Sequence, residues 1–122
     1  MLSILDIGMD KAAAYRVGGK ITEDEMKSLL ALIREKTEKY GKIFIYQEME
    51  SIGGVEPDAM IEKFKFFSEV GISHIRRIAV VTPKQWIRRI VDLEGKIFRH
   101  MDMKAFSTED KQKAIEFLTG SQ

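Results

Sequence analysis

Lys42-Ile43-Phe44-Ile45-Tyr46 is the stretch that decides the fold, because its apolar side chains alternate onto both faces of a strand. A strand that is apolar on both faces is typical of the centre of a sheet that helices cover on each side. A second strongly apolar strand is predicted over residues 75–81. Both strands should therefore lie inside one sheet.

Helical stretches separate the predicted strands. The clearest begins at a capping box, Thr22–Glu25, and should end near Tyr40, where Gly41 can adopt the left-handed conformation that closes a helix. Pro57 and Pro83 each occupy a first helical position, where the missing amide costs little. Four helices are predicted, over residues 23–40, 57–70, 83–97 and 107–118.

The outer strands complete the predicted sheet. Residues 2–7 and 13–17 should pair as a hairpin that adds one antiparallel strand, and residues 101–106 alternate as an edge strand does. Alternating strands and helices imply parallel pairing through crossover helices. The prediction is an α/β fold: one domain over residues 1–122, with a mixed, mostly parallel sheet of about five strands and four helices.

Composition excludes several classes of protein. The 122 residues include no cysteine, so a disulfide-stapled secreted module is ruled out and the cytoplasm is the expected compartment. The 20 basic and 19 acidic residues give a net charge of +1, which argues against a nucleic-acid partner. The apolar runs are far shorter than the ~20 residues that span a bilayer, and no targeting segment is expected.

The near-neutral total hides two oppositely charged segments. Residues 48–69 contain six acidic and two basic side chains, a net charge of −4. Residues 76–104 contain eight basic and three acidic side chains, a net charge of +5. The predicted second helix is thus acidic at its start and the third is basic.

These two helices begin at the carboxyl ends of the two most apolar strands, where ligands collect in open α/β sheets. A cleft between them would suit a small apolar or amphipathic ligand. The aromatic and aliphatic residues involved are more often part of a core than of a pocket. The predicted lining is Tyr46, Met49, Ile52, Met60, Phe64, Phe67, Trp86 and Ile90.

The third helix could also contact an anionic membrane surface. Its basic side chains, Lys84, Arg88 and Arg89, adjoin Trp86, and this combination is typical of helices at the headgroup layer. The alternative is an ordinary amphipathic helix whose apolar stripe, formed by Trp86, Ile90, Leu93 and Ile97, packs into the core.

Groups for catalysis or metal binding do not converge in the sequence. His74 and His100 precede strands, at the end of the sheet opposite to the usual ligand site. Glu48 and Glu50 follow a strand at the productive end and could serve as acid and base, but a solvated acidic loop is the simpler interpretation. No metal, no cofactor and no enzymatic activity are expected.

The whole chain resembles the SpoIIAA-like proteins, small bacterial domains related in fold to the STAS anti-sigma-factor antagonists and, more distantly, to CRAL-TRIO lipid-binding domains. The resemblance rests on Gly19-Lys20-Ile21-Thr22-Glu23-Asp24, on Ile43–Tyr46, on Val80-Val81-Thr82-Pro83-Lys84-Gln85-Trp86 and on the closing Phe106–Leu118. The antagonists are switched by a phosphoserine in an Asp-Ser-Ser-Gly type motif. Ser51 lacks that motif around it, so the resemblance does not extend to the switch.

The SpoIIAA-like resemblance implies a ligand-binding cleft and membrane association. The leading hypothesis is therefore a non-enzymatic cytoplasmic domain that binds an apolar or lipid-like ligand, with peripheral attachment at the inner membrane face. The alternative is a protein interaction module of the anti-sigma-factor-antagonist type. A homodimer through an edge strand or exposed apolar helices is also considered.

Overall fold

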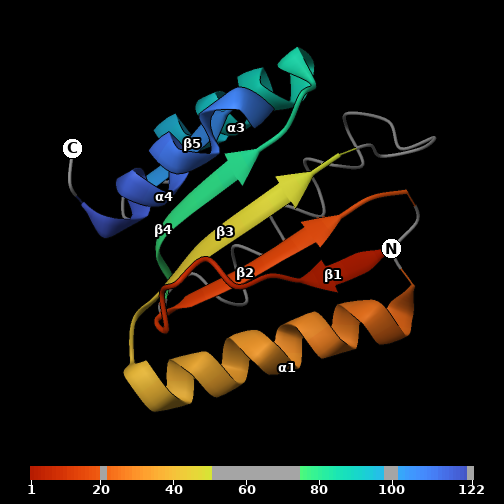
Figure 1. Ribbon diagram of the computed structural model, residues 1–122, viewed down its shortest axis with the longest axis vertical. Helices are drawn as coiled ribbons and strands as arrows, with labels where there is room; N and C mark the ends of the chain where they lie inside the picture. Colours follow the sequence, from red (N-terminus) through yellow and green to blue (C-terminus); the bar gives the residue numbers. More distant parts are fainter. Residues whose placement is uncertain (20–21, 51–74, 98–101, 121–122) are drawn as a thin grey trace.

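The computed structural model describes residues 1–19, 22–50, 75–97 and 102–120 of the protein (Figure 1). Within these ranges five strands form one sheet in the spatial order β1-β2-β3-β4-β5. The pair β1–β2 is antiparallel, and all later pairs are parallel. This confirms the mostly parallel sheet with one antiparallel edge. The strands are β1 (Leu2–Ile4), β2 (Ala12–Val17), β3 (Ile43–Met49), β4 (Ile75–Val81) and β5 (Asp102–Phe106).

Three α-helices lie in the described ranges: α1 (Glu23–Tyr40), α3 (Gln85–Ile97) and α4 (Lys111–Thr119). A single 3₁₀ turn, η2 (Thr108–Asp110), precedes α4. The fourth predicted helix, over residues 57–70, lies outside the described residues, as do His74 and His100. The α/β class follows from these elements.

The ends of α1 follow the local sequence signals. Thr22 Oγ1 accepts a hydrogen bond from the Glu25 amide at 3.1 Å, and Glu25 Oε1 accepts one from the Thr22 amide at 3.0 Å. Gly41 follows the helix with φ +82°, a conformation that side chains rarely adopt. Both predicted ends of this helix are confirmed.

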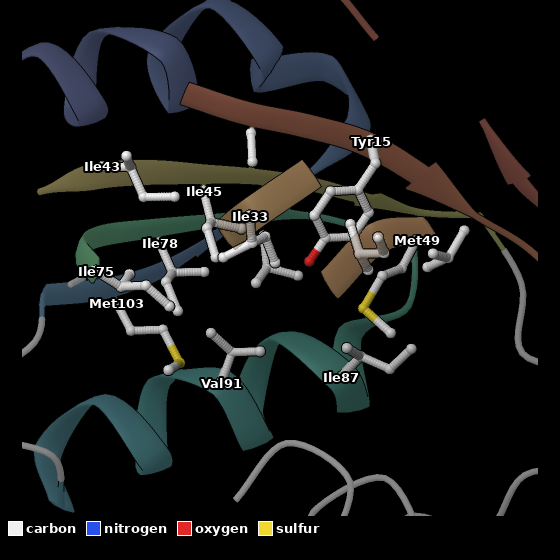
Figure 2. Packing of buried hydrophobic residues seen from close by; sticks show 14 residues of the cluster. Tyr15, Ile33, Ile43, Ile45, Met49, Ile75, Ile78, Ile87, Val91 and Met103 are labelled. Carbon is white, nitrogen blue, oxygen red and sulfur yellow. The ribbon is translucent and has the colours of Figure 1, made fainter. Parts of the chain in front are cut away.

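One face of the sheet packs against α1 and α3. Leu29 and Ile33 of α1 and Ile87 and Val91 of α3 are buried against apolar side chains of the strands. Figure 2 shows Ile87 and Val91 pointing toward the sheet, close to Met49 and Met103. In the strand register Ile45 neighbours Ile78, which neighbours Met103. The strand residues of this cluster are Ala13, Tyr15, Val17, Ile43, Ile45, Met49, Ile75, Ile78, Val80 and Met103.

The opposite face packs against α4. Ala114 and Leu118 of α4 are fully buried against a cluster that contains Tyr46 and Phe106. Ala79 of β4 belongs to the same cluster and is fully buried. The other strand residues of this cluster are Ala14 and Val81.

The apolar stripe of α3 differs from the prediction. Ile87 is 2% exposed and Val91 is also buried, whereas Trp86, expected in the stripe, is 37% exposed. One helical residue is a rotation of about 100°, so a stripe centred on Ile87 and Val91 turns Trp86 out of the core. The side chains of Ile90, Leu93 and Ile97 lie outside the described residues.

Candidate functional site

A buried carboxylate with two partly exposed cationic partners lies at the carboxyl end of β3. Glu48 is only 7% exposed and faces the α4 side of the sheet. Tyr46 Oη donates a hydrogen bond to Glu48 Oε2 at 2.8 Å, and Arg16 Nε donates one to Oε1 at 3.1 Å. Lys111 Nζ lies 3.4 Å from the same Oε1. We call Arg16, Tyr46, Glu48 and Lys111 the Glu48 cluster.

The register of the strands brings the Glu48 cluster together. Arg16 on β2 is the parallel neighbour of Glu48 on β3, so their side chains project side by side. Tyr46 lies two residues before Glu48 and therefore on the same face of the strand. Lys111 is the first residue of α4, which links the start of that helix to the sheet.

Electrostatics keep the Glu48 carboxylate ionised. Burial opposes its ionisation, but the hydrogen bonds from Tyr46 and Arg16 and the attraction of Lys111 outweigh that effect, so the pKa of Glu48 lies below its ordinary value. Burial and the hydrogen bond to Glu48 raise the pKa of Tyr46. The hydrogen bond to Glu48 also raises the pKa of Arg16. Glu48 is thus a fixed anion between two cations.

The solvated acidic loop expected around Glu48 is wrong for that residue. Strand β3 extends to Met49, three residues beyond the predicted end, and the extension carries Glu48 into the sheet. Glu50, by contrast, is exposed, with Oε1 3.4 Å from Arg16 Nε. The sequence did contain a signal for this extension: Glu48 follows Tyr46 at the two-residue spacing of side chains on one face of a strand.

The structure does not bring the described residues of the predicted cleft together. Tyr46 is buried on the α4 side, and Met49 is buried on the α1 and α3 side, because an odd spacing in a strand places side chains on opposite faces. Trp86 is exposed on α3. The remaining predicted lining residues lie outside the described residues: Ile52, Met60, Phe64, Phe67 and the side chain of Ile90. Ligand binding itself stays a prediction.

The residues predicted to touch a membrane occupy the start of α3. Lys84, Trp86 and Arg89 are exposed, and we call them the α3 patch. Trp86 and Arg89 are three residues apart in the helix and so lie on one side of it. Arg88 differs from the prediction: it is only half-exposed, and its Nη1 donates a hydrogen bond to the Thr82 carbonyl oxygen at 2.8 Å.

A hollow in the described surface lies elsewhere. It is lined by residues of the connection between β1 and β2, by two alanines of β2 and by Lys36 of α1. The lining residues are Leu5, Asp6, Ile7, Met9, Asp10, Ala12, Ala14 and Lys36. Lys36 Nζ donates a hydrogen bond to the Asp10 carbonyl oxygen at 2.8 Å. Because β2 begins here, the hollow is at the end of the sheet opposite to Glu48. Within the described ranges, no three potential metal-ligating side chains converge.

None of the described helices combines the length and the apolar character that a bilayer span needs.

The sheet order, the helices on both faces and the antiparallel edge strand together define a STAS-like α/β domain. Residues 12–119 match the family model described as SpoIIAA-like. That match spans most of the sequence, and the chain belongs to the SpoIIAA-like family.

A solved structure supports the same fold. The chain is similar to an uncharacterized protein of the DUF3478 family with a SpoIIAA-like fold from Shewanella loihica PV-4. The two share 19% identity with a TM-score of 0.66, over 97% of this chain and 92% of the other. At this identity the likeness concerns the fold alone. None of the curated proteins matches the chain.

Proposed function

We propose that this SpoIIAA-like domain is a non-enzymatic module that binds an amphipathic, anionic ligand and attaches peripherally to an anionic lipid surface. The observation that carries the proposal is the α3 patch, in which Trp86, Lys84 and Arg89 are all exposed at the start of α3. The two cations would meet an anionic headgroup, and the indole ring would sit against the apolar part of the same molecule. The proposed location is cytoplasmic, at the inner membrane face.

The number of exposed cations in the α3 patch sets the expected strength of membrane attachment. Each Lys or Arg near an anionic surface contributes about 1 kcal/mol, and this attraction falls off within a Debye length. Two exposed cations and one Trp therefore support weak, reversible binding that weakens as salt rises. Arg88 contributes less, because its guanidinium is already engaged with Thr82.

The Glu48 cluster supports a binding role over a catalytic one. A general acid or base needs a pKa near the working pH, whereas the pKa of Glu48 lies below its ordinary value. Both carboxylate oxygens of Glu48 already accept from protein donors. The cluster therefore serves to hold α4 on the sheet.

Trp86 provides the test, because it is the only tryptophan in the chain. Its fluorescence is recorded as vesicles of phosphatidylcholine, with and without phosphatidylserine, are added. We expect the Trp86 emission to shift to the blue only with the vesicles that contain phosphatidylserine, and we expect high salt to reverse this shift. An identical spectrum with both kinds of vesicle would contradict the proposal.

Charge reversal gives the matched control. Lys84→Glu and Arg89→Glu should each abolish the shift. Lys42→Glu makes the same change of charge at an exposed position before β3, at the opposite end of the sheet, and should leave the shift intact. Equal loss in all three variants would show that net charge, and not the α3 patch, is responsible.

The second candidate is a protein interaction module of the anti-sigma-factor-antagonist type. The SpoIIAA-like family match is the observation that favours it. A stoichiometric protein partner that co-purifies with the native chain, combined with no response to anionic vesicles, would select this function over lipid binding.

A further inference from the structure

Strand β5 presents an outer edge with a defined hydrogen-bonding pattern. The Thr82 amide donates to the Phe106 carbonyl oxygen at 3.0 Å, so the backbone groups of Phe106 point toward β4. Because these groups alternate along a strand, those of Asp102 and Lys104 point the same way, and those of Met103 and Ala105 point outward. In the part of the chain that the structure describes, no strand pairs with this edge.

The side chains along β5 carry opposite charges at alternate positions. Met103 is buried on the α3 side, which places Asp102 and Lys104 on the α4 side, where both are exposed. Asp102 Oδ2 lies 3.5 Å from Arg77 Nε on β4. Lys104 Nζ lies 5.4 Å from the centre of the Phe106 ring. Asp102 and Lys104 form a short, self-complementary charge pattern.

We propose that the outer edge of β5 pairs with β5 of a second copy of the chain, antiparallel, about a two-fold axis at Met103. In this register Met103 faces Met103 of the second copy. The two residues form a hydrogen-bonded pair, because their outward-pointing amides and carbonyl oxygens bond to each other. Asp102 then faces Lys104 of the second copy in the closer, non-hydrogen-bonded pairing, and the symmetry repeats this contact.

Charge selects this register over its neighbour. A shift of the two-fold axis by one residue would place Lys104 opposite Lys104 of the second copy, and like charges that face each other destabilise a pair of strands. In the proposed register Asp102 lies between Arg77 of its own chain and Lys104 of the second copy, so the charges alternate across the joined sheet. In the competing interpretation, the charge of Lys104 prevents another strand from pairing with the free edge of β5. That interpretation predicts a monomer.

Sedimentation equilibrium of the full chain decides between these interpretations. We expect a concentration-dependent dimer that Lys104→Glu and Asp102→Lys each weaken by about tenfold or more, because each variant places two like-charge pairs across the axis. An equimolar mixture of the two variants should regain the dimer, since every facing pair is again of opposite charge. The control variant Lys42→Glu should leave the dimer unchanged.

Two outcomes would overturn the proposal. The first is a wild-type monomer at every concentration. The second is a mixture of the two charge variants that associates no better than either variant alone while circular dichroism shows both to be folded. Neither outcome depends on lipid binding, because the α3 patch is unaltered in both variants.

Cross-linking tests the register directly. The chain has no cysteine, so Asp102→Cys and Lys104→Cys introduce the only thiols. A non-hydrogen-bonded pair has Cα atoms about 4.5 Å apart, within the range that a disulfide spans. Mild oxidation of the mixed variants should therefore yield mainly the mixed disulfide. If the mixed variants form no more disulfide-linked dimer than either variant alone, the proposed register is wrong.

Discussion

Glu48→Gln is the most informative single substitution in the described structure, because it removes one charge while keeping nearly the same volume. The wild-type carboxylate faces Arg16 Nε at 3.1 Å and Lys111 Nζ at 3.4 Å. In the variant both cations lose their buried counter-ion, while the hydrogen bond with Tyr46 can still form. The change therefore isolates the charge of the Glu48 cluster from its packing.

The expected loss follows from the burial of the partners. A hydrogen bond to a charged group contributes roughly 1.5–3 kcal/mol, and the partial exposure of Lys111 and Arg16 favours the low end for the whole cluster. We expect Glu48→Gln to lower the free energy of unfolding by about 2 kcal/mol. At about 4 °C per kcal/mol for a domain of this size, thermal unfolding should shift down by about 8 °C.

The pH dependence gives an independent signature. The pKa of Glu48 is lowered in the folded state, so its carboxylate stabilises the fold above the unfolded-state pKa, which is about 4.3. This contribution disappears as pH falls through the lowered folded-state pKa. The free energies of unfolding of wild type and Glu48→Gln should therefore show their full difference at neutral pH and become equal in acid. Urea unfolding at a series of pH values measures both.

Glu50→Gln is the matched control for Glu48→Gln. Glu50 also lies near Arg16, at 3.4 Å, but its carboxylate is exposed. Exposed ion pairs contribute little, so this variant should unfold within about 2 °C of wild type. Equal shifts for the two variants, or a Glu48→Gln shift that persists unchanged in acid, would refute the reasoning.

Two further substitutions test the packing and the helix end. Ala114→Leu adds volume at a fully buried position of α4, in the cluster that also contains Ala79, so it should lower the free energy of unfolding by roughly 1–3 kcal/mol in urea titrations. An unchanged midpoint would mean that α4 does not pack here. Thr22→Ala removes the acceptor for the Glu25 amide and should cost about 1 kcal/mol. Faster hydrogen exchange at Glu25 is expected, and unchanged protection there would exclude the capping box in solution.

The sequence predicted the parts of the fold that depend on local signals. The capping box at Thr22 and the glycine at position 41 define both ends of α1 because they act on the nearest backbone groups. The apolar run that begins at Ile43 identified an interior strand, because hydrophobic patterning reports burial on both faces. The antiparallel edge followed from the short connection between the first two strands.

The candidate site was less predictable, because it depends on register and rotation. Trp86 and Ile87 are adjacent and both apolar, and only packing against the sheet decides that Ile87 is buried. Glu48 becomes a buried anion through Arg16 and Lys111, which are 32 and 63 residues away in sequence. No local pattern in the sequence predicts such distant pairings.

The position of α4 also has a consequence for folding during synthesis. Lys111–Thr119 follows every strand in sequence, yet this helix covers Tyr46 and Ala79 in the middle of the sheet. The ribosome therefore completes all five strands before the helix that shields this face has emerged. Until then the nascent sheet presents an apolar surface to the solvent, and chaperones would bind it most readily in that interval.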